Sequence, residues 1–206
     1  ETAAIELEDY LLNLDTKHEA YQELHQLLTW MLIETGQYRR ALIVSRQYES
    51  TTNGLNYSLY SVASQLNSVN EFELAAEGYQ YYIERGTTTI RFRSMHQLAN
   101  VYYDWAQYIQ DFSTDSYNRQ MQLFQKSYEL NSKLAEEASR YDRIGEVYVK
   151  QFDMSLDIFS NIEWARDWQN RLSELNDAEY EAHKLYAEGS LHIFTGNFTR
   201  ARQLLT

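Results

Sequence analysis

The histidines and the acidic side chains are the residues of this chain that could perform chemistry. A dinuclear carboxylate site in a helical bundle needs a Glu-x-x-His pair on each of two helices. Only Asp15 and His18 have this spacing, with the shorter acid, and no His-Glu-x-x-His motif is present. Glu188 and His192 stand four residues apart and could share one helical face. These pairs supply too few ligands for a metal ion, so we expect no metal site.

Other kinds of catalytic site find even less support in the sequence. The chain has no cysteine, which excludes thiolate nucleophiles, thiolate metal ligands and disulfide bonds. No two of its seven glycines fall within five residues, so a glycine-rich phosphate-binding loop is missing, as is a Gly-x-Ser-x-Gly elbow. The pair Glu136 and Glu137 could do acid–base work, but a solvated helix face explains it better. We predict no catalytic residues, no cofactor and no enzymatic activity.

The charge balance limits the partners of the chain. It carries 30 acidic and 18 basic side chains, a net charge of −12, and its longest basic run is Arg39-Arg40. Nucleic acid would be repelled by this excess of negative charge. The most apolar stretch, Leu27 to Ile33, is far shorter than a membrane span of about 20 residues. We therefore expect a soluble protein, cytoplasmic or periplasmic, that binds neither nucleic acid nor the membrane interior.

The composition predicts an all-helical chain. Proline is absent from all 206 residues, and helix-forming Leu, Ala, Glu, Gln and Arg are abundant. No stretch of six residues alternates strictly between apolar and polar residues, as a half-buried strand would. Apolar residues instead recur at intervals of three and four near the start of the chain, at Leu11, Leu14, Tyr21, Leu24, Leu28 and Leu32.

One short pattern occurs three times, as GQYRRAL from Gly36, NEFELAA from Asn70 and GNFTRAR from Gly196. Each copy is a turn residue, a polar residue and an aromatic, followed three residues later by alanine. The alanines of the first two copies, Ala41 and Ala75, are 34 residues apart, a period typical of helical repeats. We interpret each copy as the turn and second-helix start of a helical hairpin. The alanines would mark close helix contacts, and the aromatics Tyr38, Phe72 and Phe198 would plug the groove to a neighbouring hairpin.

A second pattern places a small residue between large ones on the preceding helix. It occurs as Leu59-x-x-Val62-Ala63-x-x-Leu66, Met95-x-x-Leu98-Ala99-x-x-Tyr102 and Tyr141-x-x-Ile144-Gly145-x-x-Tyr148. With these two patterns the chain resembles the tetratricopeptide repeat family, in degenerate form and without the family's closing proline. The resemblance implies a right-handed superhelical α-α solenoid of antiparallel helix pairs. It also implies a role in binding other proteins.

The resemblance divides the chain into successive units of one array. Repeat 4 would have its second helix at Phe152, Ser155 and Phe159, after a short turn. We expect further repeats in the parent protein, because the fifth unit ends soon after Ala201. The units are a partial or capping helix at 1–15, repeat 1 at 21–49, repeat 2 at 55–85, repeat 3 with an insertion at 90–131, repeat 4 with a long extension at 135–179, and a truncated repeat 5 at 180–206. Residues 161–179 would form an atypical capping helix.

In this family the first helices of successive repeats line a concave groove that binds extended peptides. Carried over to this chain, the resemblance gives a candidate groove of Tyr60, Ser64, Asn67, Arg93, His96, Asn100 and Tyr103. A clamp that holds the terminal carboxylate of a bound peptide would need basic or amide side chains on several successive first helices, and only Arg93 and Asn100 lie near such positions. The corresponding positions of repeats 1 and 4 are mainly acidic or neutral, at Glu23, Gln26, Trp30, Asp142 and Glu146. This lining favours a neutral or basic peptide.

The sequence thus predicts a non-enzymatic scaffold that binds a protein or peptide. One alternative is a sensory module, in which the same groove binds a small molecule or signalling peptide and another domain gives the output. An enzyme is the third possibility, and no group of residues supports it. The sequence predicts neither the identity of the partner nor the oligomeric state.

Overall fold

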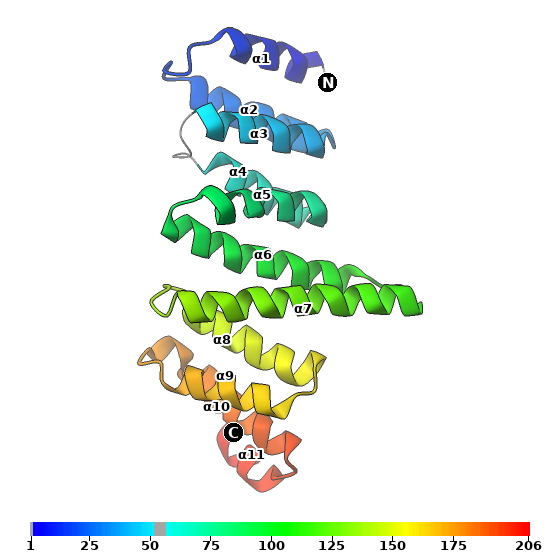
Figure 1. The fold of residues 1–206 in the computed structure, drawn as a ribbon, viewed down its shortest axis with the longest axis vertical. Coiled ribbons are helices and arrows are strands. Elements are labelled where there is room, and N and C mark those ends of the chain that lie inside the picture. The colour runs from blue at the N-terminus through cyan, green and yellow to red at the C-terminus, as the bar shows by residue number, and fades with distance from the viewer. Residues whose placement is uncertain (1, 52–56) are drawn as a thin grey trace. The chain divides into compact units, whose positions relative to one another are not determined.

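Every regular element in the described residues of this computed structural model, 2–51 and 57–206, is helical (Figure 1), which confirms the all-α class. The α-helices are α1 Thr2–Asn13, α2 Tyr21–Glu34, α3 Tyr38–Thr51, α4 Ser58–Ser68, α5 Phe72–Arg85, α6 Thr88–Tyr108, α7 Thr114–Glu137, α8 Ile144–Asp153, α9 Ile162–Ser173, α10 Glu181–Phe194 and α11 Phe198–Leu205. A π-helix, Met154–Ile158, continues α8, and a 3₁₀-helix, Ala178–Tyr180, precedes α10.

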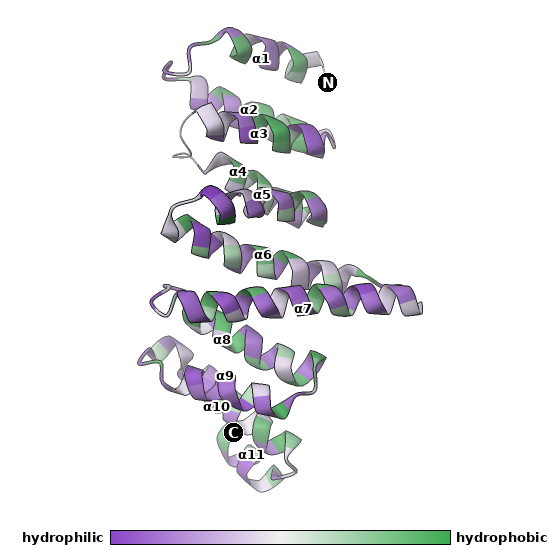
Figure 2. Ribbon diagram, in the orientation of Figure 1, coloured by the Kyte–Doolittle hydropathy of each residue, from purple (hydrophilic) through white to green (hydrophobic). Residues whose placement is uncertain are grey.

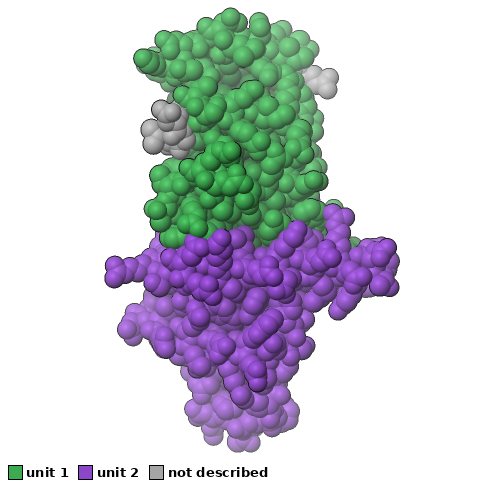
Figure 3. All heavy atoms as spheres, viewed as in Figure 1, with its two compact units in different colours: residues 1–110 green, residues 111–206 purple. Residues whose placement is uncertain are grey.

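The chain forms two compact units, Glu1–Gln110 and Asp111–Thr206 (Figure 3). The first unit holds α1 to α6 and the second holds α7 to α11. The division falls in the polar linker between α6 and α7, within the range expected for repeat 3. In the second unit Asp111 organises this linker. Its carboxylate accepts hydrogen bonds from the Ser113 and Ser116 hydroxyls, each at 2.8 Å, which lower its pKa.

The three copies of the repeated pattern form the same turn. Gly36, Asn70 and Gly196 all have positive φ angles, of 71°, 65° and 77°. The next residue then donates its backbone N–H to the carbonyl five positions earlier, the bond that closes a Schellman motif at a helix C-terminus. These bonds are Gln37 to Leu32 at 2.7 Å, Glu71 to Leu66 at 2.9 Å and Asn197 to His192 at 2.8 Å. The following aromatic begins α3, α5 and α11, so the predicted turns and second-helix starts are confirmed.

The small residues of both patterns lie where helices approach closely. Ala41, Ala63 and Ala75 are fully buried, and Ala201 is 3% exposed. Between α4 and α5 the fit is tight at Gly78, where an added Cβ would stand 2.7 Å from the Cβ of Ala63. A side chain on α5 at this point would push the two helices apart, because neither backbone can yield locally.

The packing role expected of the pattern's aromatic is confirmed for Phe72. Phe72 is 5% exposed and lies against Trp105 and Tyr108 of α6, with ring centroids 6.1 and 5.4 Å away. Phe198 is 67% exposed, so the prediction for it stays a prediction. In the described residues no helix follows α11 to cover Phe198.

The predicted second helix of repeat 4 is wrong. Phe152 lies in the last turn of α8, Ser155 lies in the π-helix that continues this helix without a break, and Phe159 follows directly. The chain turns only at Ser160, which has φ 49°, and α9 starts after Asn161, whose side chain accepts the Trp164 N–H at 3.1 Å. No proline or glycine stands between Tyr148 and Ser155 to end the helix earlier. Helix α9 falls within 161–179, the range expected for an extra capping helix.

A buried network of polar groups joins the helices of the second unit. The Trp168 indole N–H of α9 donates to the Tyr128 hydroxyl of α7 at 2.7 Å. The Gln151 amide of α8 donates to the Tyr128 carbonyl at 3.0 Å and to the Ser132 hydroxyl at 2.8 Å. These bonds satisfy buried donors, so they fix how α7, α8 and α9 pack.

Polar residues interrupt the apolar ones along the helices (Figure 2). Among the helices of residues 2–51 and 57–206, none combines the length and the apolar character that crossing a bilayer requires.

Candidate functional site

Helix α4 carries three of the candidate groove residues on one side. Tyr60, Ser64 and Asn67 follow each other at intervals of four and three, which keeps them on one helical face. Tyr60 is half-buried, and its ring meets that of Tyr79 on α5 edge-on, with centroids 5.1 Å apart. Ser64 is exposed and also hydrogen-bonds Tyr79. Burial raises the pKa of Tyr79 above its ordinary value, so this hydroxyl stays neutral and can anchor both residues.

A hydrogen bond links the candidate residues of α4 to those of α6. The Asn67 side-chain N–H donates to the Asp104 carboxylate at 3.1 Å. The two residues are 37 positions apart, so the bond joins two helices that α5 separates in the chain. This contact brings the α4 and α6 positions together on one side of the first unit.

The candidate residues of helix α6 are at least partly exposed to solvent, with one exception. Arg93 is exposed, Asn100 and Tyr103 are half-buried, and the Tyr103 hydroxyl accepts a hydrogen bond from the Gln107 amide at 3.3 Å. His96 is only 2% exposed and therefore cannot line an open groove. His96 stands among the buried residues Ser94, Met95 and Leu98, so it belongs to the packed side of α6.

The exposed line of α6 includes three residues that the family pattern did not point to. Gln97, Asp104 and Gln107 join Arg93 and Asn100 at alternating intervals of four and three. All three are at least partly exposed. The sequence could have indicated these three residues, because they are polar and recur at helical spacing. The family pattern pointed to the buried His96 instead.

Helix α2 contacts α4, so we add its candidate positions to the set. Glu23 and Gln26 are exposed, and the Trp30 side chain is 53% exposed. We call the combined set the first-helix surface. It consists of Glu23, Gln26 and Trp30 on α2, of Tyr60, Ser64 and Asn67 on α4, and of Arg93, Gln97, Asn100, Tyr103, Asp104 and Gln107 on α6. Its charged members are two acids and one arginine.

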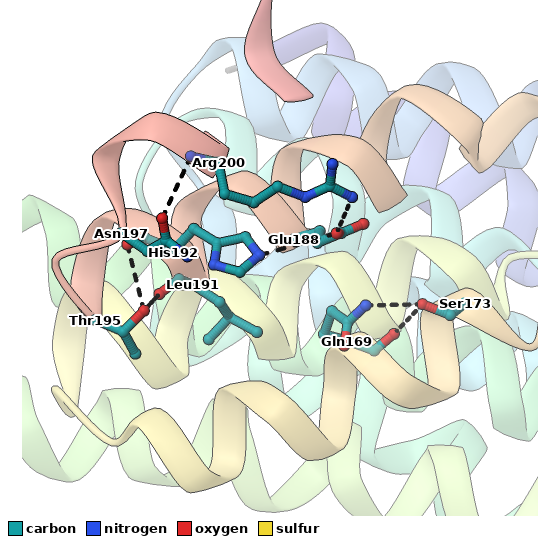
Figure 4. Close-up of polar contacts among 8 residues, drawn as sticks. All are labelled: Gln169, Ser173, Glu188, Leu191, His192, Thr195, Asn197 and Arg200. Carbon is teal, nitrogen blue, oxygen red and sulfur yellow. Dashed lines mark hydrogen bonds and ion pairs between the residues drawn. The ribbon is translucent and has the colours of Figure 1, made fainter. Parts of the chain in front are cut away.

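In the second unit, Glu188 takes part in ion pairing. Its carboxylate lies 3.3 Å from the Arg200 guanidinium and 3.9 Å from the His192 ring (Figure 4). Asn197 accepts the Arg200 backbone N–H at 3.4 Å and so caps α11. Glu146, a position compared with the family's groove, is paired with Arg143. Across residues 2–51 and 57–206, no three His, Cys, Asp or Glu side chains gather closely enough to hold a metal ion.

Comparison with models of known protein families gives no match to this chain. Comparison with curated proteins gives no match either.

Asp153, at the junction of α8 and the π-helix, has the most perturbed carboxyl group of the second unit. Burial is the main cause, and together with the nearby Asp157 carboxylate it raises the pKa of this carboxyl to about 6, although Lys150 and His183 act in the opposite direction. The folded state therefore binds a proton more tightly than the unfolded chain, whose Asp pKa is ordinary. Stability is gained as pH falls through 6 toward about 4, and ionised Asp153 opposes folding above pH 6.

Asp153→Asn should therefore raise the melting temperature at pH 8, because the amide carries no charge to desolvate. The gain should correspond to about 1 kcal/mol, discounted for the partial exposure of the side chain, and it should shrink toward zero by about pH 4. Thermal melts of both proteins from pH 4 to 8 measure it. Asp167→Asn, which changes an exposed carboxylate on α9, is the matched control. A lower melting temperature for Asp153→Asn at pH 8 would contradict the assignment.

Proposed function

We propose that this chain is a non-enzymatic scaffold of helical hairpins like those of tetratricopeptide repeats, and that it binds a neutral or basic peptide on the first-helix surface. The observation that carries the proposal is the Asn67–Asp104 hydrogen bond. It aligns the exposed rows of α4 and α6, so that polar groups from successive hairpins face the same side of the first unit. The shared Schellman turns of two hairpins in this unit, at Gly36 and Asn70, support the resemblance.

The chemistry of the first-helix surface suits an extended peptide. Carboxamides such as Asn100 and Gln97 can donate to a peptide carbonyl and accept from a peptide N–H at the same time. The exposed face of Trp30 offers a large and rigid apolar contact, of the kind that dominates protein interfaces. Glu23 and Asp104 outnumber Arg93, so acidic peptides are disfavoured and basic ones are attracted.

Selection of binding peptides from a random library tests the proposal on the whole chain. We expect the selected peptides to be neutral or positively charged. The double variant Trp30→Ala/Asn100→Ala should weaken their binding about tenfold or more, because it removes one aromatic anchor and one bidentate amide. Gln80→Ala/Tyr117→Ala, which changes exposed residues outside the first-helix surface, should leave affinity unchanged.

Circular dichroism establishes that both double variants fold like the parent chain. Two outcomes would refute the proposal. In one, the selected peptides are mainly acidic. In the other, they bind the Trp30→Ala/Asn100→Ala variant as tightly as they bind the parent.

A further inference from the structure

A pocket of about 370 Å³ lies among α1, α2, α3 and the segment that joins α1 to α2. Its apolar walls include Leu11, Leu28 and Val44, one from each of these helices. The pocket is separate from the first-helix surface, with which it shares no residue. Its volume falls within the range of about 300–1,000 Å³ that is common for small-molecule sites.

Three rings form a stacked wall in this pocket. The Tyr48 ring stacks on the His25 imidazole with centroids 4.2 Å apart, and the Tyr21 ring stacks on Tyr48 at 5.7 Å. Tyr48 and His25 are buried, whereas Tyr21 is half-buried. A second aromatic molecule can extend such a stack, because offset rings attract one another beyond simple apolar burial.

His25 brings an unsatisfied acceptor to the pocket wall. The residue is 4% exposed, and one of its ring nitrogens is bonded to the Val44 backbone. Within the described part of the chain, the other nitrogen, Nδ1, has no hydrogen-bond partner and is closed to solvent. Burial lowers the pKa of His25 to about 4, so the ring is neutral at pH 7 and Nδ1 accepts a hydrogen bond. A buried acceptor without a partner is costly, and a bound donor would remove that cost.

The charge of the pocket also restricts its ligand. Among its described lining residues, Glu8 carries the one formal charge at pH 7, and Glu8 is paired with Arg40 of α3. A charged ligand would therefore lose its hydration without gaining a free counter-charge. An uncharged ligand avoids this loss.

We propose that this pocket binds a small uncharged aromatic molecule with one N–H or O–H group, which stacks beside Tyr21 and Tyr48 and donates to His25 Nδ1. Nδ1 is reached when the half-buried Tyr21 ring turns aside. The volume has room for about twelve non-hydrogen atoms, taking roughly 30 Å³ for each, as for a water molecule in the liquid. One or two fused rings fit within that limit. This site does not depend on the proposed peptide-binding function.

Titration of the chain with indole and with 1-methylindole tests the proposal, because the two probes differ in the N–H group. Two-dimensional NMR follows the signals of Tyr21, His25 and Tyr48. We expect indole to bind saturably with a Kd on the order of 0.1–1 mM, as a nine-atom ligand of ordinary efficiency would. 1-Methylindole should bind about threefold to tenfold more weakly, the effect of losing one neutral hydrogen bond.

The variant His25→Phe keeps a ring in the wall and removes the acceptor. If it folds, as judged by circular dichroism, it should bind both probes equally. The comparison of the two probes on the natural chain stands whether or not the variant folds. The proposal is overturned if indole causes no saturable shifts at these three residues up to about 5 mM, or if the natural chain binds the two probes equally.

Discussion

Replacing Phe72 by alanine should lower the free energy of unfolding by about 3–5 kcal/mol, the usual cost of truncating a buried phenylalanine. Phe72 is 5% exposed at the start of α5, and its ring fills the space against Trp105 and Tyr108 of α6. The packed helices cannot collapse fully onto alanine, so a cavity adds to the lost burial. Urea denaturation followed by circular dichroism measures the change.

Phe198→Ala is the matched control, since it alters the same position of the repeated pattern. Its ring is 67% exposed, so the free energy of unfolding should change by less than about 0.5 kcal/mol. Equal losses for the two variants would refute the view that this aromatic stabilises the chain only where a following helix covers it.

Gly145→Ala should destabilise the second unit by about 1–3 kcal/mol through overpacking. A Cβ at this position of α8 would stand 2.3, 2.4 and 2.6 Å from three ring carbons of Tyr180. Tyr180 is 7% exposed, and its rigid ring has little room to retreat. Gly145 is the second residue of α8, where the greater helix propensity of alanine offsets little of this cost. Thermal denaturation at pH 7 measures the loss.

Gly189→Ala makes the same substitution within α10 and should be neutral or stabilising by up to about 1 kcal/mol. The added Cβ would meet the Leu205 side chain at 2.7 Å, but Leu205 is 45% exposed near the end of α11 and can swing away. Alanine also has a better helix propensity than glycine within a helix. A melting temperature for Gly145→Ala equal to or above that for Gly189→Ala would show that Tyr180 yields more easily than its burial suggests.

The candidate site was predictable from the sequence as a row of positions on a helix, and less so residue by residue. The family pattern placed Arg93, Asn100 and Tyr103 on a surface of α6, but it also included His96, which is buried. The sequence carried no sign that Asn67 and Asp104 meet, because 37 residues separate them. The pocket beside His25 was equally hidden, since its walls come from three helices whose packing no local pattern specifies.

The sequence by itself determined the helical class and the three turns that share the repeated pattern. These features depend on residues a few positions apart, such as the positive φ angle at Gly36 or Asn70 and the Schellman bond that follows it. Only the tertiary structure decided which aromatic was covered and which polar groups were buried. Those outcomes depend on helices distant in the chain, because burial is a property of the neighbours that a residue meets after folding.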